Sequence, residues 1–387
     1  MEFDFDFFDH TVDRRGTDSM KWDENPEALP MWVADMDFKT APCIIDALIK
    51  RVEHGVFGYT HVPREYFSAT VDWFSRRHGW KFDADSVIYT SGVVPAISAI
   101  IKALTKPGDK VVVQTPAYNC FFSSIRNNGC LLLANELIDT AGGYQMDFED
   151  LERKLADPDA KVMILCNPHN PVGRVWSRDE LLRVGEACLR NNVFVISDEI
   201  HCELTYDGFD YTPFGSLGDK FADNSAICIS PSKAFNIAGL QIANIVTRDY
   251  RVRAKIDRAI NDNEVCDVNP FGVIATIEAY RRGELWLDGL RKYLYNNYLL
   301  VKDFFSTTFP EYPVTPLQGT YLAWINVTES GLTGKEFCKK LLDKTGLMLN
   351  DGEMYGKGGE YFVRLNFACP RSTLRDAFDR LKAYSKM

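Results

Sequence analysis

Lys233 stands just after a strongly apolar run, residues 226–229, in the sequence Ser230-Pro231-Ser232-Lys233. The run predicts a buried strand, and the proline ends it because proline cannot continue a central strand. A lysine amine just beyond an inner strand can form a Schiff base in a crevice, and Ser230 and Ser232 can donate hydrogen bonds to a phosphate. A lone lysine at such a position is usually a solvated surface residue. Whether Lys233 has a chemical role therefore depends on the other candidate residues.

A carboxylate and an amide follow two other apolar runs. Asp198 lies at the end of residues 193–199, and Asn170 lies in a turn-rich sequence that starts at Asn167. Asp198 can cap a helix, bind a metal, or pair with a pyridine nitrogen and keep that ring protonated as an electron acceptor. Asn170 can occupy a turn or donate to a phenolate oxygen on the same ring.

Three further candidates complete the set. Gly92 and Val93 lead into a helical pattern whose backbone amides and dipole suit a phosphate, although helix capping explains the same residues. Tyr118 can stack on a flat ring or pack in the core. Arg364 lies inside the apolar strand pattern 361–368, where a buried arginine is costly unless paired. Its partner is either a structural aspartate or a carboxylate ligand bound in bidentate fashion.

The elements that must position these residues alternate between apolar runs and helical patterns from about residue 86 onward. This alternation predicts an α/β fold with a mostly parallel sheet covered on both faces. Ligands bind such sheets beyond the carboxyl ends of the strands, which is where the candidates stand. The predicted strands are residues 86–92, 110–114, 129–137, 161–167, 193–199, 225–230 and 242–247.

The pattern changes after about residue 280. Long helical periodicity gives way to shorter strand patterns at 319–327, 346–351 and 361–368, which predict a smaller α+β domain. We therefore expect three parts, with no flexible linker between them. They are an N-terminal segment joining the small domain (1–45), a large cofactor-binding domain (46–283) and a small C-terminal domain (284–387).

Composition limits the classes of partner. The net charge of −10 argues against nucleic acid, and no stretch approaches the ~18 apolar residues of a membrane helix. The 10 cysteines are scattered without a CxxC pair, which favours a reducing cytoplasm without disulfides. His201, Cys202 and Glu203 fit no zinc spacing, so no metal is expected.

Together these residues resemble the fold-type I pyridoxal phosphate enzymes of the class I/II aminotransferase superfamily, and the match spans nearly the whole chain. The resemblance implies a large domain whose mostly parallel sheet is of the seven-stranded type. Several phrases resemble the cystathionine β-lyase and cysteine C–S lyase subgroup, which includes cystalysin-like enzymes. Among them are MWVADMDF (31–38), NPHNPVG (167–173), SPSKAFNIAGLQ (230–241) and VRLNFACPRS (363–372).

The resemblance implies roles in binding pyridoxal 5′-phosphate. Lys233 would hold the cofactor covalently and shuttle the substrate Cα proton. Asp198 would pair with the pyridine nitrogen, Tyr118 would stack on the ring, and Asn170 would bind the 3′ oxygen. The other implied cofactor contacts are Gly92, Val93, Asn167, His201, Ser230 and Ser232.

The resemblance also implies a partner and a substrate clamp. Tyr59 would reach the phosphate of a neighbouring subunit, which makes a homodimer part of the site. Arg364 would bind the α-carboxylate of an amino-acid substrate, assisted by the backbone near Val33 and Ala34.

Two departures from the aminotransferase pattern are consistent with the lyase subgroup. His201 stands where aminotransferases often have a tyrosine, and Gln241 where they often have an arginine for the phosphate. The expected reaction is α,β-elimination from L-cystathionine or a related cysteine S-conjugate, giving a thiol such as homocysteine, pyruvate and ammonia. One alternative is an aminotransferase. Another is a regulatory protein that binds the cofactor and acts through protein–protein contact.

Overall fold

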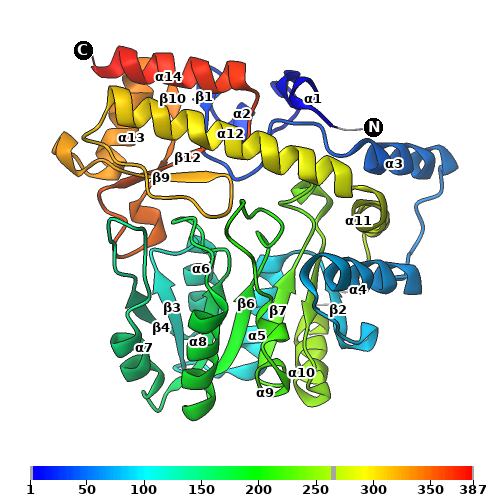
Figure 1. The fold of residues 1–387 in the computed structure, drawn as a ribbon. Coiled ribbons are helices and arrows are strands. Elements are labelled where there is room, and N and C mark those ends of the chain that lie inside the picture. The colour runs from blue at the N-terminus through cyan, green and yellow to red at the C-terminus, as the bar shows by residue number, and fades with distance from the viewer. Residues whose placement is uncertain (1–2, 263–266, 386–387) are drawn as a thin grey trace.

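The computed structural model of the chain describes residues 3–262 and 267–385. Its larger part is a seven-stranded sheet with helices on both faces, and elements from the last third of the chain lie across one end of that sheet (Figure 1). The predicted α/β class is confirmed. Within the described residues, no helix combines the length and apolar character needed to cross a membrane.

The large sheet has the strand order β2-β8-β7-β6-β5-β3-β4. The strands from β4 to β7 pair in parallel, whereas β8 runs antiparallel to both of its neighbours. The prediction of a mostly parallel sheet is therefore confirmed. The strands are β2 (Val87–Thr90), β3 (Lys110–Thr115), β4 (Leu131–Glu136), β5 (Ala160–Cys166), β6 (Phe194–Asp198), β7 (Ser225–Ile229) and β8 (Ala243–Val246).

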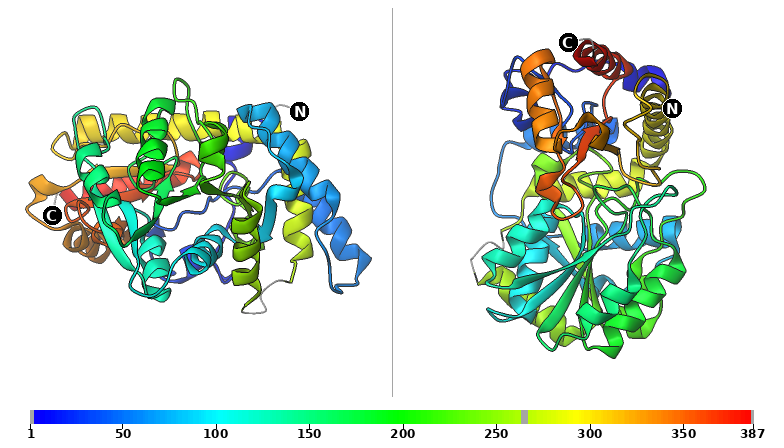
Figure 2. Two further views of the ribbon diagram at one scale, coloured as in Figure 1. Left: turned by 90° about the horizontal axis from the view of Figure 1, so that it is seen from below. Right: turned by 90° about the vertical axis from the view of Figure 1, so that its left-hand side faces the viewer.

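Successive side chains along a strand point to opposite faces of this sheet, and helices cover both faces. Val111 and Val113 of β3 pack in one core cluster together with helix α5 (Val93–Leu104), whereas Val112 packs in another together with helix α8 (Arg178–Arg190). The right-hand view of Figure 2 shows the helices on the two sides of the strands. Because both faces of the inner strands are buried, these strands are largely apolar, which is why the sequence predicts them well.

The remaining helices flank the large sheet or, as α12 does, lie beside the C-terminal part (Figure 1). The helical pattern that follows Gly92 in the sequence is α5, which starts at Val93 because Gly92 takes the N-cap position. The other helices up to residue 308 are α1 (Phe5–Asp9), α2 (Met20–Asp23), α3 (Pro42–His54), α4 (Arg64–His78), α6 (Asn119–Asn127), α7 (Phe148–Leu155), α9 (Asp219–Ala222), α10 (Tyr250–Asn261), α11 (Pro270–Arg282) and α12 (Glu284–Thr308). Short 3₁₀ helices are η1 (Ala84–Ser86), η2 (Phe214–Ser216), η3 (Ala238–Leu240), η4 (Thr328–Ser330) and η5 (Glu353–Tyr355).

The C-terminal part holds an antiparallel sheet of order β11-β12-β9. Its elements are β9 (Leu322–Asn326), α13 (Gly334–Thr345), β10 (Leu347–Met348), β11 (Asn350–Asp351), β12 (Phe362–Asn366) and α14 (Arg371–Ser385). The N-terminal segment joins this part, because β1 (Leu29–Pro30) pairs in parallel with β10. The division of the chain at residues 45 and 283 stays a prediction.

Candidate active site

A cavity of about 440 Å³ opens where residues at the carboxyl ends of β5, β6 and β7 face β12 and the loop of residues 31–38. Ligands are expected at this edge of an open parallel sheet. Most of the predicted site residues line the cavity. They are Val33, Ala34, Gly92, Val93, Tyr118, Asn170, Asp198, His201, Ser232, Lys233 and Arg364.

Lys233 follows β7 and directs its amine toward the loop of residues 31–38. Its Nζ donates a 2.6 Å hydrogen bond to the carbonyl oxygen of Ala34. Burial lowers the pKa of the Lys233 amine to about 8; the positive charge of Arg364 acts in the same direction, while the carboxylate of Asp35 opposes both. Lys233 is therefore more readily neutral and nucleophilic than an ordinary lysine.

Asp198 is the last residue of β6 and is 4% exposed. Among the described residues its side chain accepts one hydrogen bond, from the backbone N–H of Ile200 at 3.1 Å, and it forms no ion pair. Burial raises the pKa of Asp198 to about 7. A buried carboxylate with so little compensation favours a cationic partner, and a protonated ring nitrogen is such a partner.

His201 forms a neutral part of the wall. Its ring lies edge-on to Tyr321, with the two centroids 5.9 Å apart, and its Nδ1 has no hydrogen-bond partner among the described residues. Burial lowers the pKa of His201 to about 3, and the charges of Lys233 and Arg364 act in the same direction. The imidazole is therefore uncharged and keeps one ring nitrogen available to a ligand.

Arg364 projects from β12 and is 3% exposed. One terminal nitrogen donates to Asn170 Oδ1 at 3.1 Å and the other to the carbonyl oxygen of Trp32 at 3.0 Å. Its Nε has no partner, and within the described residues the guanidinium forms no ion pair. Among the described residues, no aspartate pairs with Arg364, although a structural aspartate is one of its two expected partners. The guanidinium therefore remains suited to a carboxylate ligand.

The loop of residues 31–38 is held over the cavity by side chains from the C-terminal part. Asn366 donates to the carbonyl oxygen of Val33 at 2.5 Å, and the Tyr321 hydroxyl donates to that of Ala34 at 2.9 Å. Val33 and Ala34 therefore meet the cavity through a fixed backbone, and their contact with a substrate stays a prediction.

The N-terminus of α5 opens on the same cavity. Gly92 is the N-cap and offers no side chain to the first backbone N–H groups of the helix. A Cβ at Gly92 would lie 3.3 Å from Pro95 Cδ, so the position has little room for a larger residue. Free N–H groups at Val93 and beyond, together with the helix dipole, suit a phosphate.

Ser232 lines the cavity, whereas Ser230 does not. The Ser230 hydroxyl donates to the carbonyl oxygen of Ile242 at 2.5 Å, accepts from the backbone N–H of Ser232, and lies 2.7 Å from the Ser232 hydroxyl. Ser230 thus fixes the loop on which Ser232 is presented. A direct phosphate contact from Ser230 stays a prediction.

Two other predicted residues lie away from the cavity in this chain. Asn167 is fully buried, with its amide donating to Thr212 and its oxygen accepting from the backbone of Trp176, each at 3.2 Å. Tyr59 is 98% exposed on the loop after α3. Neither residue lines the cavity, so their contacts with a cofactor stay predictions.

Several cavity residues are not predicted from the sequence. Tyr355 lies under Arg364, with the guanidinium carbon 5.0 Å from the ring centroid. Asn350 donates to the carbonyl oxygen of Trp32 at 3.0 Å and so helps to hold the loop. Cys120 also lines the wall. Cys120 lies in the first turn of α6, Tyr355 ends η5 and Asn350 begins β11, so no shared local pattern marks these three residues in the sequence.

The buried cluster next to the site is not a strong metal centre. The structure groups Cys202 and Glu203 with His78, not with His201. Glu203 already accepts hydrogen bonds from Trp73 at 2.6 Å, Arg77 at 3.1 Å and His78 at 2.7 Å. The adjacent guanidinium opposes the binding of a cation.

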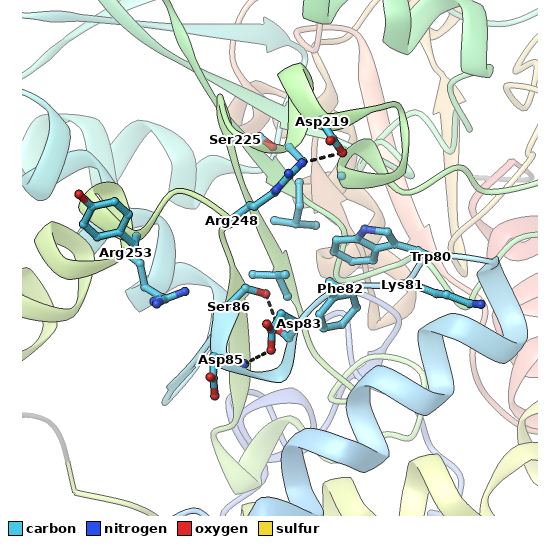
Figure 3. Close-up of a pocket in the computed structure, with 15 residues that line it drawn as sticks. Trp80, Lys81, Phe82, Asp83, Asp85, Ser86, Asp219, Ser225, Arg248 and Arg253 are labelled. Atoms are coloured by element: carbon cyan, nitrogen blue, oxygen red, sulfur yellow. Dashed lines mark hydrogen bonds and ion pairs between the residues drawn. The ribbon is translucent and has the colours of Figure 1, made fainter.

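A second cavity of about 530 Å³ lies at a different edge of the large sheet (Figure 3). Its Arg248 is paired with Asp219 at 2.6 Å, and Asp83 accepts from the backbone of Asp85. It is slightly larger than the first cavity, but its charged side chains without an ion pair among the described residues, such as Lys81 and Asp85, are at least partly exposed to solvent, whereas the unpaired carboxylate and guanidinium of the first cavity are buried. Chemistry, not volume, marks the candidate active site.

The donor set fits the cofactor that the resemblance implies. An uncapped helix N-terminus beside the Ser232 hydroxyl suits a phosphate, and the unpaired carboxylate of Asp198 suits a cationic ring nitrogen. The amine of Lys233 lies in the same cavity and suits an aldehyde. These features occur together, so the residues present match pyridoxal 5′-phosphate.

Comparison with known proteins agrees with this geometry. The family model "Aminotransferase class I and II" matches residues 29–381. Cystathionine beta-lyase PatB of Bacillus subtilis (strain 168) is 45% identical over 382 residues, covering 97% of this chain and 99% of that protein. Cystalysin from Treponema denticola, solved with a pyridoxal 5′-phosphate cofactor, superposes with a TM-score of 0.95 at 35% identity, covering 100% of this chain and 99% of the other. The pyridoxal phosphate-bound C–S lyase from Staphylococcus hominis gives 0.90 at 32% identity, covering 97% and 98%.

Proposed function

The chain belongs to the class I and II aminotransferase family, and from this we propose that it is a pyridoxal 5′-phosphate-dependent carbon–sulfur β-lyase. Its substrates are L-cystathionine or related S-conjugates of cysteine. The overall reaction takes one water and converts R–S–CH₂–CH(NH₃⁺)–COO⁻ into the thiol R–SH, pyruvate and ammonium. The relatives named as a cystathionine β-lyase and a C–S lyase support this reaction.

One observation carries the proposal. Arg364 is buried, lacks a carboxylate partner among the described residues, and lines the same cavity as Lys233. A buried guanidinium without a counter-ion is unfavourable in a protein that binds no anion there. An amino-acid carboxylate on Arg364 places the adjacent Cα in the cavity that holds the lysine amine.

The residues that line the cavity then have different roles in the proposed reaction. When bound, pyridoxal phosphate supplies an electron sink that makes the Cα proton acidic. Lys233, whose pKa is lowered to about 8, takes that proton at Nζ as a general base. Asp198 holds a positive charge at the ring nitrogen, and the neutral His201 adds no competing charge.

The remaining roles concern orientation. Asn170 fixes Arg364 through their 3.1 Å hydrogen bond and would bind the ring oxygen of the cofactor, and Tyr118 would stack on its ring. The N-terminus of α5 and Ser232 would hold its phosphate. Ser230 and Asn167 act beneath them through the hydrogen bonds that shape their loops.

The proposed enzyme is a homodimer in which Tyr59 reaches the partner's phosphate. Tyr59 is 98% exposed, and the exposed apolar residues Val52, Val56 and Phe57 lie close to it in sequence. An exposed group of this kind is typical of a protein–protein contact. The described cysteines are all free, which supports a reducing, cytoplasmic location.

Incubation of the cofactor-loaded protein with L-cystathionine, without any 2-oxo acid, tests the function. We expect pyruvate and homocysteine in equal amounts. Strict dependence of turnover on an added 2-oxo acid would make the protein an aminotransferase. Cofactor binding without turnover of cystathionine, cysteine or methionine would favour a regulatory role.

A further inference from the structure

We infer that the active site is built for cysteine S-conjugates whose leaving thiol is uncharged and apolar. Resting on the proposed function, this names the class of thioether that the site prefers. Cystathionine, whose leaving group carries its own ammonium and carboxylate, is then a poorer substrate than a conjugate with an alkyl or aryl group on sulfur.

Each charged side chain of the cavity already has a role in binding the cofactor or the α-carboxylate of the substrate. Among the described residues that line it, the only aspartate, glutamate, lysine or arginine side chains are Asp198, Lys233 and Arg364. The cofactor takes the first two, and the substrate α-carboxylate takes the third. No lining cation therefore remains for an acid group on the far side of the sulfur.

Two nearby cations already form ion pairs with aspartates. Lys21 is 1% exposed and pairs with Asp37 at 2.8 Å. Arg14 pairs with Asp35 at 2.6 Å and with Asp37 at 2.7 Å. Neither cation lines the cavity, and drawing either one toward a ligand would break its ion pair with the buried Asp37.

The rest of the wall is largely apolar and sulfur-containing. Met20, Trp32, Val94, Pro95 and Met354 line the cavity, and Met20 is 69% exposed. Methionine side chains adapt their shape and make favourable contacts with apolar and aromatic groups. This surface suits an alkyl or aryl thiol and offers no cation to a carboxylate.

The loop that we propose to reach the neighbouring cavity does not change this balance. The loop that carries Tyr59, residues 55–63, has the sequence GVFGYTHVP and contains no lysine, arginine, aspartate or glutamate. If that loop meets the neighbouring cavity, it adds aromatic and apolar surface and one histidine.

Two substrates that differ in one group test the inference. S-ethyl-L-cysteine and S-carboxymethyl-L-cysteine differ by a methyl group against a carboxylate at the end of the side chain. We expect kcat/KM for pyruvate release to be about tenfold or more higher for the ethyl compound, because the carboxylate loses water without gaining a partner. Equal values, or a preference for the carboxymethyl compound, would overturn the inference.

A binding measurement separates this inference from the lyase proposal. L-norleucine and L-2-aminoadipate are the sulfur-free counterparts of the two substrates and cannot undergo β-elimination of a thiol. Calorimetry on the cofactor-loaded protein should show norleucine bound about tenfold more tightly. If neither thioether gives pyruvate, the lyase proposal fails. The relative affinities of norleucine and 2-aminoadipate then still test the inferred preference for an apolar side chain, because a tighter binding of 2-aminoadipate would overturn it.

Substitution at the mouth of the cavity locates the leaving group. Because Met20 is largely exposed, Met20→Lys places a solvated cation there without burying it. We expect the ethyl-to-carboxymethyl ratio of kcat/KM to fall about threefold or more in Met20→Lys. Met20→Gln, of similar length but neutral, is the control and should move the ratio by less than about twofold. An unchanged ratio in Met20→Lys would overturn the assignment of this wall to the leaving thiol.

Discussion

The amine of Lys233 donates a 2.6 Å hydrogen bond to the carbonyl oxygen of Ala34, a residue 199 positions earlier in the chain. The same oxygen accepts from the Tyr321 hydroxyl, which comes from the C-terminal part. The lysine of the large sheet is thus positioned by a loop that the C-terminal part holds in place. The N-terminal segment is therefore part of the candidate active site, through this backbone and through the side chains of Met20 and Trp32.

Removal of the Lys233 amine is the most direct test of the site. We expect Lys233→Ala to lose the visible absorbance of a covalently held cofactor and to lower turnover by about 10³-fold or more. Absorption spectra and pyruvate release measure both effects. Lys344→Ala, at an exposed position of α13, is the matched control. Retained absorbance in the first variant would place the covalent link on another residue.

Arg364 should control substrate binding through the α-carboxylate. Arg364→Ala removes the guanidinium, and we expect kcat/KM to fall roughly 10²-fold or more, mostly through KM, because charge-assisted hydrogen bonds are lost. Arg364→Lys keeps the charge without the planar fork and should lie between the two proteins. Kinetics unchanged by Arg364→Ala would remove this residue from the site.

The titration of Lys233 should depend on its charged neighbours. In the cofactor-free protein we expect acylation of this amine to rise with pH around a midpoint near 8, because the neutral amine reacts and its pKa is lowered to about 8. Arg364 lowers this pKa and Asp35 raises it. The midpoint should therefore move up in Arg364→Gln and down in Asp35→Asn. Shifts in the same direction in both variants would contradict this electrostatic account.

Much of this site follows from the sequence because strands of a buried parallel sheet are apolar throughout. Their ends are visible, so Asp198 and Lys233 can be placed at one edge without coordinates. The direction in which a loop side chain points cannot be predicted from the sequence in this way. Ser230 and Ser232 are two positions apart, yet only Ser232 lines the cavity, and Asn167 and Asn170 differ in the same respect. Long-range contacts such as Tyr321 with Ala34 leave no local pattern at all.

The ion pairs beneath the loop should contribute to stability. Although burial raises the pKa of Asp37, the charge of Lys21 and hydrogen bonds from Lys21, Trp22 and Arg14 outweigh it and lower that pKa below its usual value. The stabilisation is therefore present above the unfolded-state pKa and is lost as the pH falls through the lower folded-state value. We expect Asp37→Asn to reduce the free energy of unfolding at neutral pH by roughly 3–5 kcal/mol, measured by urea denaturation, because Lys21 stays buried. Asp376→Asn, which breaks an exposed pair with Arg380, should cost less than about 1 kcal/mol.

Mixed dimers test whether Tyr59 acts across a subunit boundary. If Tyr59 of one subunit serves the site of the other, then Tyr59→Ala and Lys233→Ala each damage both sites of their own homodimer. A mixed dimer of the two variants has one site with both substitutions and one site with neither. We expect mixing after partial unfolding to restore up to about a quarter of the native turnover, since random pairing gives half mixed dimers with one intact site each. Mixing Lys233→Ala with Arg364→Ala is the control: both side chains come from the same chain as the site, so no intact site forms. Equal turnover in the two mixtures would place Tyr59 outside the neighbouring site.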